Sequence, residues 1–254
     1  MKIDGNRVED LKIKGRSHPD WVIVLLHEGL GSVALWREFP QQLVEKTGCS
    51  VFAYSRLGYG QSDEIDLPRP LDFMQQEAKG NLPAVLEQLP EENIVLLGHS
   101  DGGSIASIYA GLEPDPRLRS LILMAPHFFV EPISVEAIAA TKTSFEEEGL
   151  REKLKKYHGT NVDTAFWGWC NTWLHSEFRQ WNIESFISKI SVPTLFIQGW
   201  QDAYGTARQA EAFQTKATCE TIIQMITGCG HHPFLEQRTK TLDAISQFLE
   251  GRPL

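Results

Sequence analysis

The sequence has few cysteines, no long apolar run and no excess of positive charge, and each shortage argues against a class of protein. Its 254 residues include four cysteines and no C-x-x-C pair, so neither a disulfide framework nor a zinc site is predicted. The longest apolar run, residues 21–26, is far too short to cross a bilayer. The formal net charge of -9 argues against nucleic acid and anionic membranes as partners, because both usually bind basic surfaces.

The chain also lacks several common motifs of targeting and of chemistry. It begins with a polar stretch rather than the apolar core of a signal peptide, and together with the unpaired cysteines this predicts a cytoplasmic protein. Neither a G-x-x-x-x-G-K-[ST] loop nor an H-E-x-x-H pair occurs, so we expect no metal and no cofactor. The expected partner is a small-molecule substrate, and the oligomeric state is left open.

Short apolar runs alternate with longer amphipathic stretches along most of the chain. Apolar runs without polar alternation are typical of parallel strands that are covered on both faces, and the stretches between them carry apolar residues at helical spacing. This order predicts an α/β fold, with a mostly parallel central sheet flanked by helices. The predicted buried strands are residues 21–26, 51–54, 94–97, 118–124, 194–197 and 221–226, with an antiparallel edge strand at residues 8–14, and the predicted helices are residues 35–46, 73–89, 103–112, 207–215 and 239–249.

One segment, residues 127–189, interrupts this pattern. It has no strong strand signal, but it is rich in helical patterns and contains four of the seven tryptophans. A helical insertion over the carboxyl edge of the sheet accounts for both properties, and ligands of open α/β sheets bind at that edge. We therefore expect a core domain of residues 1–126 and 190–254 and a helical cap of residues 127–189.

The strongest chemical signal is the sequence Gly98-His99-Ser100-Asp101-Gly102, which lies directly between a predicted strand and a predicted helix. A G-x-S-x-G motif in a strand–turn–helix setting is the nucleophile elbow. The turn is sharp and strained, so its flanking positions must lack bulk. It lifts the serine oxygen above the sheet, with the positive end of the following helix pointing at it. Ser100 is therefore the predicted nucleophile.

Two further loops supply a base and an orienting acid at the same edge of the sheet. His231 and His232 follow the last predicted strand, and a neutral imidazole there can accept the serine proton and return it to the leaving group. Asp202 follows the strand at residues 194–197. Serine, then aspartate, then histidine is the chain order that hydrolases with this elbow use, and this order favours a catalytic role for Asp202 over a turn-forming one.

This chemistry also requires an oxyanion hole, which usually pairs the N–H after the nucleophile with one from an earlier strand-end loop. The N–H of Asp101 is the predicted first donor. The loop after the strand at residues 21–26 reads HEGLG, and its glycines allow close approach of a substrate oxygen. Gly29 in this loop is the predicted second donor.

Together these motifs resemble the α/β-hydrolase superfamily over nearly the whole chain, residues 21–249. The segment at residues 54–62 (YSRLGYGQS) also matches, and in that family it is structural. The family's histidine loop commonly reads Gly-His-x-Pro-x-x-Glu, which implies that His231 rather than His232 is the base. Glu28 departs from the family pattern, since many relatives have glycine there. Its carboxylate is expected either to face away or to bind a polar group of the substrate.

The resemblance favours a serine hydrolase that cleaves a carboxylic ester through an acyl-enzyme, with thioesters and lactones equally open. Relatives that act on haloalkanes or epoxides use aspartate in place of Ser100, and proline iminopeptidases have a slightly similar loop but flank the elbow differently. Two alternatives remain, a carbon–carbon bond hydrolase of aromatic degradation and a non-catalytic small-molecule receptor. The first is disfavoured by His99 and His232, where such relatives have asparagine and tryptophan. The candidate substrate contacts are Leu30, His99, His127, Trp167 and Trp200.

Overall fold

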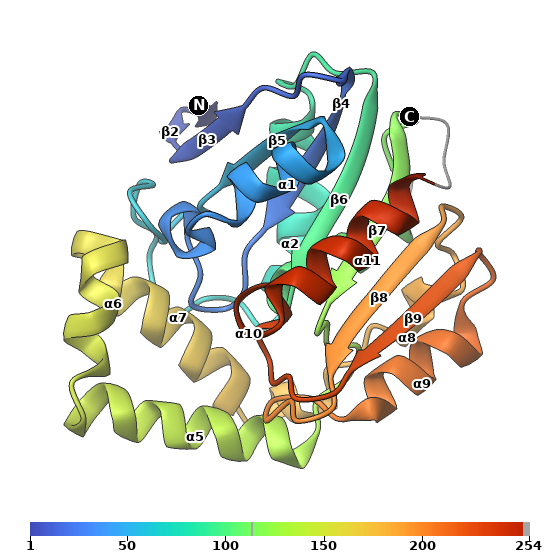
Figure 1. The fold of residues 1–254 in the computed structure, drawn as a ribbon. Coiled ribbons are helices and arrows are strands. Elements are labelled where there is room, and N and C mark those ends of the chain that lie inside the picture. Colours follow the sequence, from blue (N-terminus) through green and yellow to red (C-terminus); the bar gives the residue numbers. More distant parts are fainter. Residues whose placement is uncertain (113, 251–254) are drawn as a thin grey trace.

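The fold, taken from a computed structural model that describes residues 1–112 and 114–250, is built on one seven-stranded sheet (Figure 1). The strand order is β3-β5-β4-β6-β7-β8-β9. The edge strand β3 pairs antiparallel with β5, and every other neighbouring pair is parallel. The strands are β3 (Asp10–Ile13), β4 (His18–Leu26), β5 (Cys49–Tyr54), β6 (Asn93–His99), β7 (Leu118–Met124), β8 (Thr194–Gly199) and β9 (Thr221–Ile226).

Helices cover both faces of the sheet, and a separate apolar core lies on each side. In β4, Val22 and Val24 point into one core while Ile23 and Leu25 point into the other, which explains the unalternating apolar sequence. The first core contains side chains of α2 (Phe73–Gln76), α3 (Leu82–Leu86), α4 (Asp101–Ala110) and α9 (Ala207–Lys216), and the second contains side chains of α1 (Phe39–Thr47), α10 (Pro233–Glu236) and α11 (Arg238–Glu250). The predicted α/β class is confirmed.

Two predicted helices are interrupted. The helix expected at residues 73–89 changes to a π-helical turn at Glu77–Asn81 between α2 and α3. Pro83, which has no N–H to donate, is the second residue of α3. The helix expected at residues 35–46 is split into a 3-10 turn, Val33–Trp36, and α1. Arg37, with φ of 53°, breaks the chain direction between them.

A short hairpin near the start of the chain was not predicted. It consists of β1 (Lys2–Ile3) and β2 (Asn6–Arg7), joined through Asp4 and Gly5, which both have positive φ. Two residues with positive φ are typical of the tight turns that match the twist of a hairpin. Strands of two residues are too short for an apolar pattern to reveal them.

The chain between β7 and β8 contains helices and, within the described residues, no strand of the sheet. It forms α5 (Pro132–Glu147), α6 (Leu150–His158), α7 (Val162–Leu174) and α8 (Glu184–Ile187). In Figure 1, α5, α6 and α7 lie beyond the carboxyl ends of the strands. The division into a core domain and a cap at residues 127 and 189 stays a prediction. In the described parts of the chain, no helix is long and apolar enough to span a membrane.

Candidate active site

Ser100 occupies a strained turn between β6 and α4. Its backbone has φ of 52° and ψ of -119°, a region that non-glycine residues rarely adopt. The two flanking glycines make the turn possible, because a Cβ on Gly98 would lie 2.3 Å from the carbonyl oxygen of Gly102, and a Cβ on Gly102 would lie 2.1 Å from that of Leu26. The strand and the helix therefore approach each other closely, and they hold Ser100 at the carboxyl edge of the sheet.

Replacement of Gly102 by alanine tests this packing. In an ordinary helix, alanine is more stable than glycine by about 0.5–1 kcal/mol. Here the new methyl group meets the backbone of β4, so we expect the free energy of unfolding to fall by about 1–3 kcal/mol or more. Urea denaturation measures the change. Gly80→Ala is the matched control, because a Cβ at Gly80 meets no atom within 4 Å. Equal stability of the two variants would contradict the close approach.

Ser100, His231 and Asp202 form a continuous series of hydrogen bonds. Ser100 Oγ lies 2.9 Å from His231 Nε2, and His231 Nδ1 lies 2.9 Å from each carboxylate oxygen of Asp202. Since Nδ1 faces a carboxylate, we assign the imidazole proton to Nδ1, which leaves the Nε2 lone pair to accept from the serine hydroxyl. The three predicted residues are thus brought together in hydrogen-bond order.

The carboxylate of Asp202 is held by the backbone of its own loop. The N–H groups of Tyr204 and Gly205 donate to Oδ1 at 2.8 and 3.2 Å. Burial raises the pKa of Asp202, but the neighbouring imidazole of His231 and the N–H of Tyr204 outweigh burial and hold the pKa well below its usual value. Asp202 is therefore ionised at neutral pH and can stabilise a positive charge on His231.

A buried arginine braces the loop at residues 27–31, which we call the oxyanion loop. Arg56 Nη1 donates to the carbonyl oxygen of His27 at 2.6 Å, and Nη2 donates to that of Glu28 at 3.0 Å. The imidazole of His27 adds two bonds, donating from Nδ1 to the Glu28 carbonyl and accepting at Nε2 from the backbone N–H of Arg56. The carbonyl groups of His27 and Glu28 are thereby turned toward Arg56.

The two predicted oxyanion donors belong to residues that line one cavity with Ser100. Neither the N–H of Gly29 nor that of Asp101 donates to another backbone group within the described residues. The N–H of Asp101 also stands at the first turn of α4, where the helix dipole favours negative charge. Both donors are thus available to a substrate oxygen.

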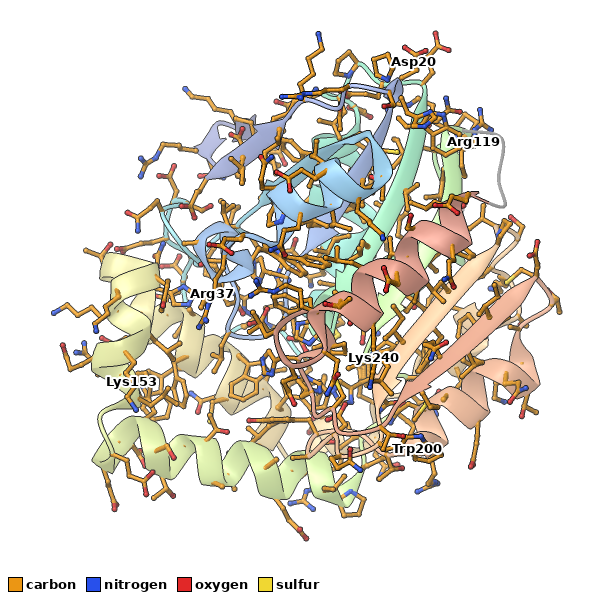
Figure 2. The ribbon with its side chains drawn as sticks, in the orientation of Figure 1. Asp20, Arg37, Arg119, Lys153, Trp200 and Lys240 are labelled. Carbon is orange, nitrogen blue, oxygen red and sulfur yellow. The ribbon has the colours of Figure 1, made fainter. Side chains whose placement is uncertain are left out.

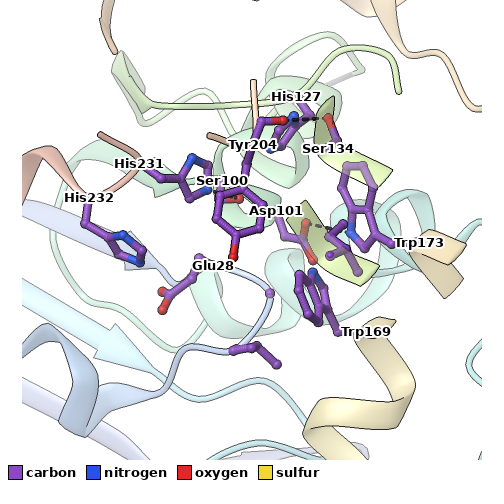
Figure 3. Close-up of a pocket in the computed structure, with 13 residues that line it drawn as sticks. Glu28, Ser100, Asp101, His127, Ser134, Trp169, Trp173, Tyr204, His231 and His232 are labelled. Carbon is purple, nitrogen blue, oxygen red and sulfur yellow. Dashed lines mark hydrogen bonds between the residues drawn. The ribbon is translucent and has the colours of Figure 1, made fainter. Parts of the chain in front are cut away.

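The cavity beside Ser100 has a volume of about 90 Å³. Its wall combines residues of the oxyanion loop, the elbow, the loops after β7, β8 and β9, and the helices α5 and α7 (Figure 3). The smallest cavity that holds one water molecule measures roughly 10–15 Å³, so this cavity is several times that minimum. It therefore fits a small substrate group. Its apolar and aromatic walls include Leu30, Ile138, Trp169, Trp173 and Tyr204.

The predicted substrate contacts divide into two groups. Leu30 and His127 line the cavity. His99 does not, because it is fully buried below the site, where its Nε2 donates to the backbone carbonyl of His231 at 2.7 Å. Trp167 packs instead on Phe145 and Phe166. Trp200 is 56% exposed and lies on the outer surface of the molecule (Figure 2). His99, Trp167 and Trp200 therefore do not line this cavity.

Several cavity residues were not predicted as substrate contacts. Trp169 and Trp173 lie four residues apart on α7, and Ser134 and Ile138 lie four apart on α5, so each pair projects from one side of its helix. Tyr204 links the loop that carries Asp202 to α5. Its carbonyl accepts a hydrogen bond from the hydroxyl of Ser134 at 2.5 Å, and its own hydroxyl lies 2.9 Å from Thr141 Oγ1. The i, i+4 spacing was available in the sequence as a signal.

The side chain of Glu28 faces the cavity and also lies beside the ring of His99. Its carboxylate lies 3.6 Å from Nδ1 of His99, and it lines the cavity together with His232. Burial raises the pKa of Glu28, but the adjacent imidazole of His99 more than offsets this and holds the pKa well below its usual value. Glu28 therefore brings a negative charge to the cavity wall. Within the described residues, no group of three or more histidine, cysteine or acidic side chains could hold a metal ion.

The sheet and the elbow define the class of the protein, an open α/β sheet with a serine on the turn after a central strand. The chain belongs to the alpha/beta hydrolase fold family, whose model matches residues 22–185. A proline iminopeptidase of Lactobacillus delbrueckii subsp. lactis is 35% identical over 286 residues, covering 96% of this chain and 95% of the relative. An esterase from Exiguobacterium antarcticum has a TM-score of 0.77 at 22% identity over 97% of each chain, and an enol-lactonase from Burkholderia xenovorans has a TM-score of 0.74 at 18% identity over 98% of each chain. The chain is therefore an α/β hydrolase.

Proposed function

We propose that this hydrolase cleaves carboxylic esters of small acyl groups, with Ser100 as nucleophile, His231 as general base and Asp202 as the residue that orients the imidazole. The observation that carries the proposal is the hydrogen-bonded series from Ser100 Oγ through His231 to Asp202. Such a series activates an otherwise weak hydroxyl nucleophile. Thioesters and lactones react through the same steps.

The reaction follows from this geometry in two halves. Ser100 Oγ attacks the substrate carbonyl while its proton moves to Nε2 of His231, and the N–H groups of Gly29 and Asp101 stabilise the oxyanion. The imidazolium then gives the proton to the leaving alkoxide, and the acyl group remains on Ser100. Water then attacks the acyl-enzyme and loses a proton to His231. The carboxylic acid is released, and the imidazolium returns its proton to Ser100.

The size of the cavity predicts a preference for short acyl chains. We expect kcat/KM for p-nitrophenyl acetate, propionate and butyrate to exceed that for the octanoate by about tenfold or more, because one extra methylene in a hydrophobic pocket can already change the rate by about that much. Release of p-nitrophenol measures the rates, and a burst equal to the enzyme concentration would report the acyl-enzyme. A rate that rises steadily with chain length would contradict the cavity assignment.

Hydrolysis of the amide bond after an N-terminal residue is a second candidate. It is favoured by the relatives named proline iminopeptidase, of which one is 35% identical over nearly the full length of both chains. The same nucleophile and base serve for amides, with His231 protonating a leaving amine. Comparison of L-proline p-nitroanilide with p-nitrophenyl acetate tests it. Faster hydrolysis of the anilide would make the peptidase reaction the main activity.

We also propose a cytoplasmic location and a small-molecule substrate as the partner. All four cysteines are free, as is usual in a reducing compartment. The net charge of -9 does not favour binding to nucleic acid.

A further inference from the structure

The carboxyl group of Asp101 is only partly used by the protein itself. The residue is 1% exposed, and its Oδ1 accepts a hydrogen bond from Trp173 Nε1 at 3.2 Å. Its Oδ2 is buried and has no hydrogen-bond partner among the described residues, although Asp101 lines the cavity beside Ser100. Figure 3 shows the carboxyl group between Ser100 and the indoles of Trp169 and Trp173. A buried acceptor without a donor costs free energy, so a ligand that supplies a donor is favoured there.

Two arginines lie near Asp101 but donate to other groups. Arg56 holds the carbonyls of the oxyanion loop, and Arg69 donates to the carbonyl of Leu57. Both guanidinium groups also lie 4.9 Å from the centre of the Tyr59 ring. Their charges favour the ionised form of Asp101, but in the described structure neither gives Oδ2 a hydrogen bond.

The cavity wall carries negative charge and, among the described residues, no lysine or arginine. Glu28 is a second carboxylate in this wall. Burial lowers the pKa of His127 and of His232 to about 3, so both imidazoles are neutral near pH 7. The indole of Trp169 adds an aromatic face, and aromatic faces attract cations. This combination favours a cation over a neutral or an anionic group.

We propose that Asp101 binds a protonated amine of the substrate, so that the enzyme prefers esters of aminoacyl groups. The inference rests on the proposed function, because it assigns the acyl group that Ser100 would carry. Ser100 and Asp101 are adjacent and line the same cavity, so an ammonium group on Oδ2 lies within a few bonds of the carbonyl that is attacked. This places the amine on the carbon next to the scissile carbonyl or on the following one.

The test compares two esters of one alcohol, L-alanine benzyl ester and benzyl propionate, which differ only in the amine. We expect wild type to have the higher kcat/KM for the alanine ester. The readout is the ratio of kcat/KM for the alanine ester to kcat/KM for the propionate. Asp101→Asn is expected to lower this ratio by about 10- to 100-fold, the range for a hydrogen bond to a charged group. Asparagine keeps an oxygen for Trp173 and keeps the backbone N–H. A purely structural role would therefore slow both esters and leave the ratio unchanged.

Glu28→Gln is the matched control, because it removes the same charge from the same cavity wall. The carboxylate of Glu28 already lies beside the His99 ring, 3.6 Å from Nδ1, so we expect a smaller fall in the ratio than in Asp101→Asn. An equal or larger fall in Glu28→Gln would overturn the assignment to Asp101. An unchanged ratio in Asp101→Asn would overturn it as well.

Binding of the esters to the inactive variant Ser100→Ala tests amine recognition independently of the proposed hydrolysis. If wild type hydrolyses neither ester, the proposed function fails. Calorimetry on Ser100→Ala with the alanine ester then still tests amine binding, with the double variant Ser100→Ala and Asp101→Asn as control. Tighter binding of the alanine ester than of the propionate, lost in the double variant, supports the inference. Equal binding of both esters overturns it.

The pH dependence of the ratio provides a second readout. Burial raises the pKa of Asp101 to about 6, against the charges of Arg56 and Arg69, the hydrogen bond from Trp173 and the charge of His231. The carboxylate is lost as the pH falls through this value while the amine stays protonated, so the ratio should fall on the acid side. Any effect of pH on the steps that both esters share cancels in the ratio. A ratio that stays constant well below pH 6 would contradict the assignment.

Discussion

Replacing Ser100 by alanine is expected to lower kcat for ester hydrolysis by roughly 10⁶-fold, as the loss of the serine does in comparable serine–histidine–aspartate sites. The change deletes the oxygen that lies 2.9 Å from Nε2 of His231, and it leaves the base without a proton to accept from a nucleophile. The backbone donors of the proposed oxyanion hole remain, so a residual rate of roughly 10³ over water is expected. No other single substitution in this chain is expected to lower kcat further.

Initial rates with p-nitrophenyl acetate measure this loss, and a fluorophosphonate probe checks it independently by labelling the serine covalently. Ser107→Ala is the matched control on the same helix, because its hydroxyl is buried and donates to the carbonyl of Gly103, and it does not line the cavity. We expect Ser107→Ala to be labelled and active. Activity of Ser100→Ala within tenfold of wild type would show that another group is the nucleophile.

Replacing Asp202 by asparagine is expected to cost roughly 10⁴-fold in kcat, the loss seen when the acid of such a series becomes an amide. The negative charge next to His231 disappears, so the imidazolium that forms during attack is no longer stabilised. The N–H groups of Tyr204 and Gly205 hold an acceptor at the Oδ1 position, which leaves the amide nitrogen at the Oδ2 position, 2.9 Å from Nδ1 of His231. A donor at that position competes with the Nδ1–H tautomer of His231, although the oxygen retained at the Oδ1 position also lies 2.9 Å from Nδ1.

The same ester assay measures this variant, with circular dichroism to verify folding. Asp243→Asn is the control, because Asp243 lies on α11, is half exposed and pairs with Lys46. We expect it to keep wild-type activity. A loss below about tenfold in Asp202→Asn, in a folded protein, would remove Asp202 from the proposed mechanism.

The central sheet could be predicted because each inner strand is buried on both faces and leaves an unbroken apolar run. The elbow could be placed because its glycines are a steric requirement, visible as the contacts of Gly98 and Gly102 with neighbouring backbone. The hairpin β1–β2 could not be predicted, because strands of two residues are too short to show an apolar pattern. The break in the helix at residues 73–86 depends on how the chain packs beside Pro83, which composition alone does not reveal.

The cavity wall was harder to predict because its aromatic residues come from a helix with aromatic side chains on more than one side. Trp169 and Trp173 face the cavity, whereas Trp167 packs on Phe145 and Phe166. Which of these tryptophans faces the cavity depends on the rotation of α7 about its axis. That rotation is set by contacts of α7 with α5 and α6 rather than by the sequence of α7. The loops at strand ends have no such freedom, so Ser100 and Asp202 were easier to place.

The guanidinium of Arg56, fixed behind the oxyanion loop, has a consequence for how enzymes of this kind diversify. It holds the main chain at His27 and Glu28 through carbonyl groups alone, so the path of that backbone does not depend on which side chains the loop carries toward the cavity. Mutation at position 28 or 30 can then change substrate preference while the proposed oxyanion donor at Gly29 keeps its place. Selectivity and catalytic power become separately evolvable traits of one short loop.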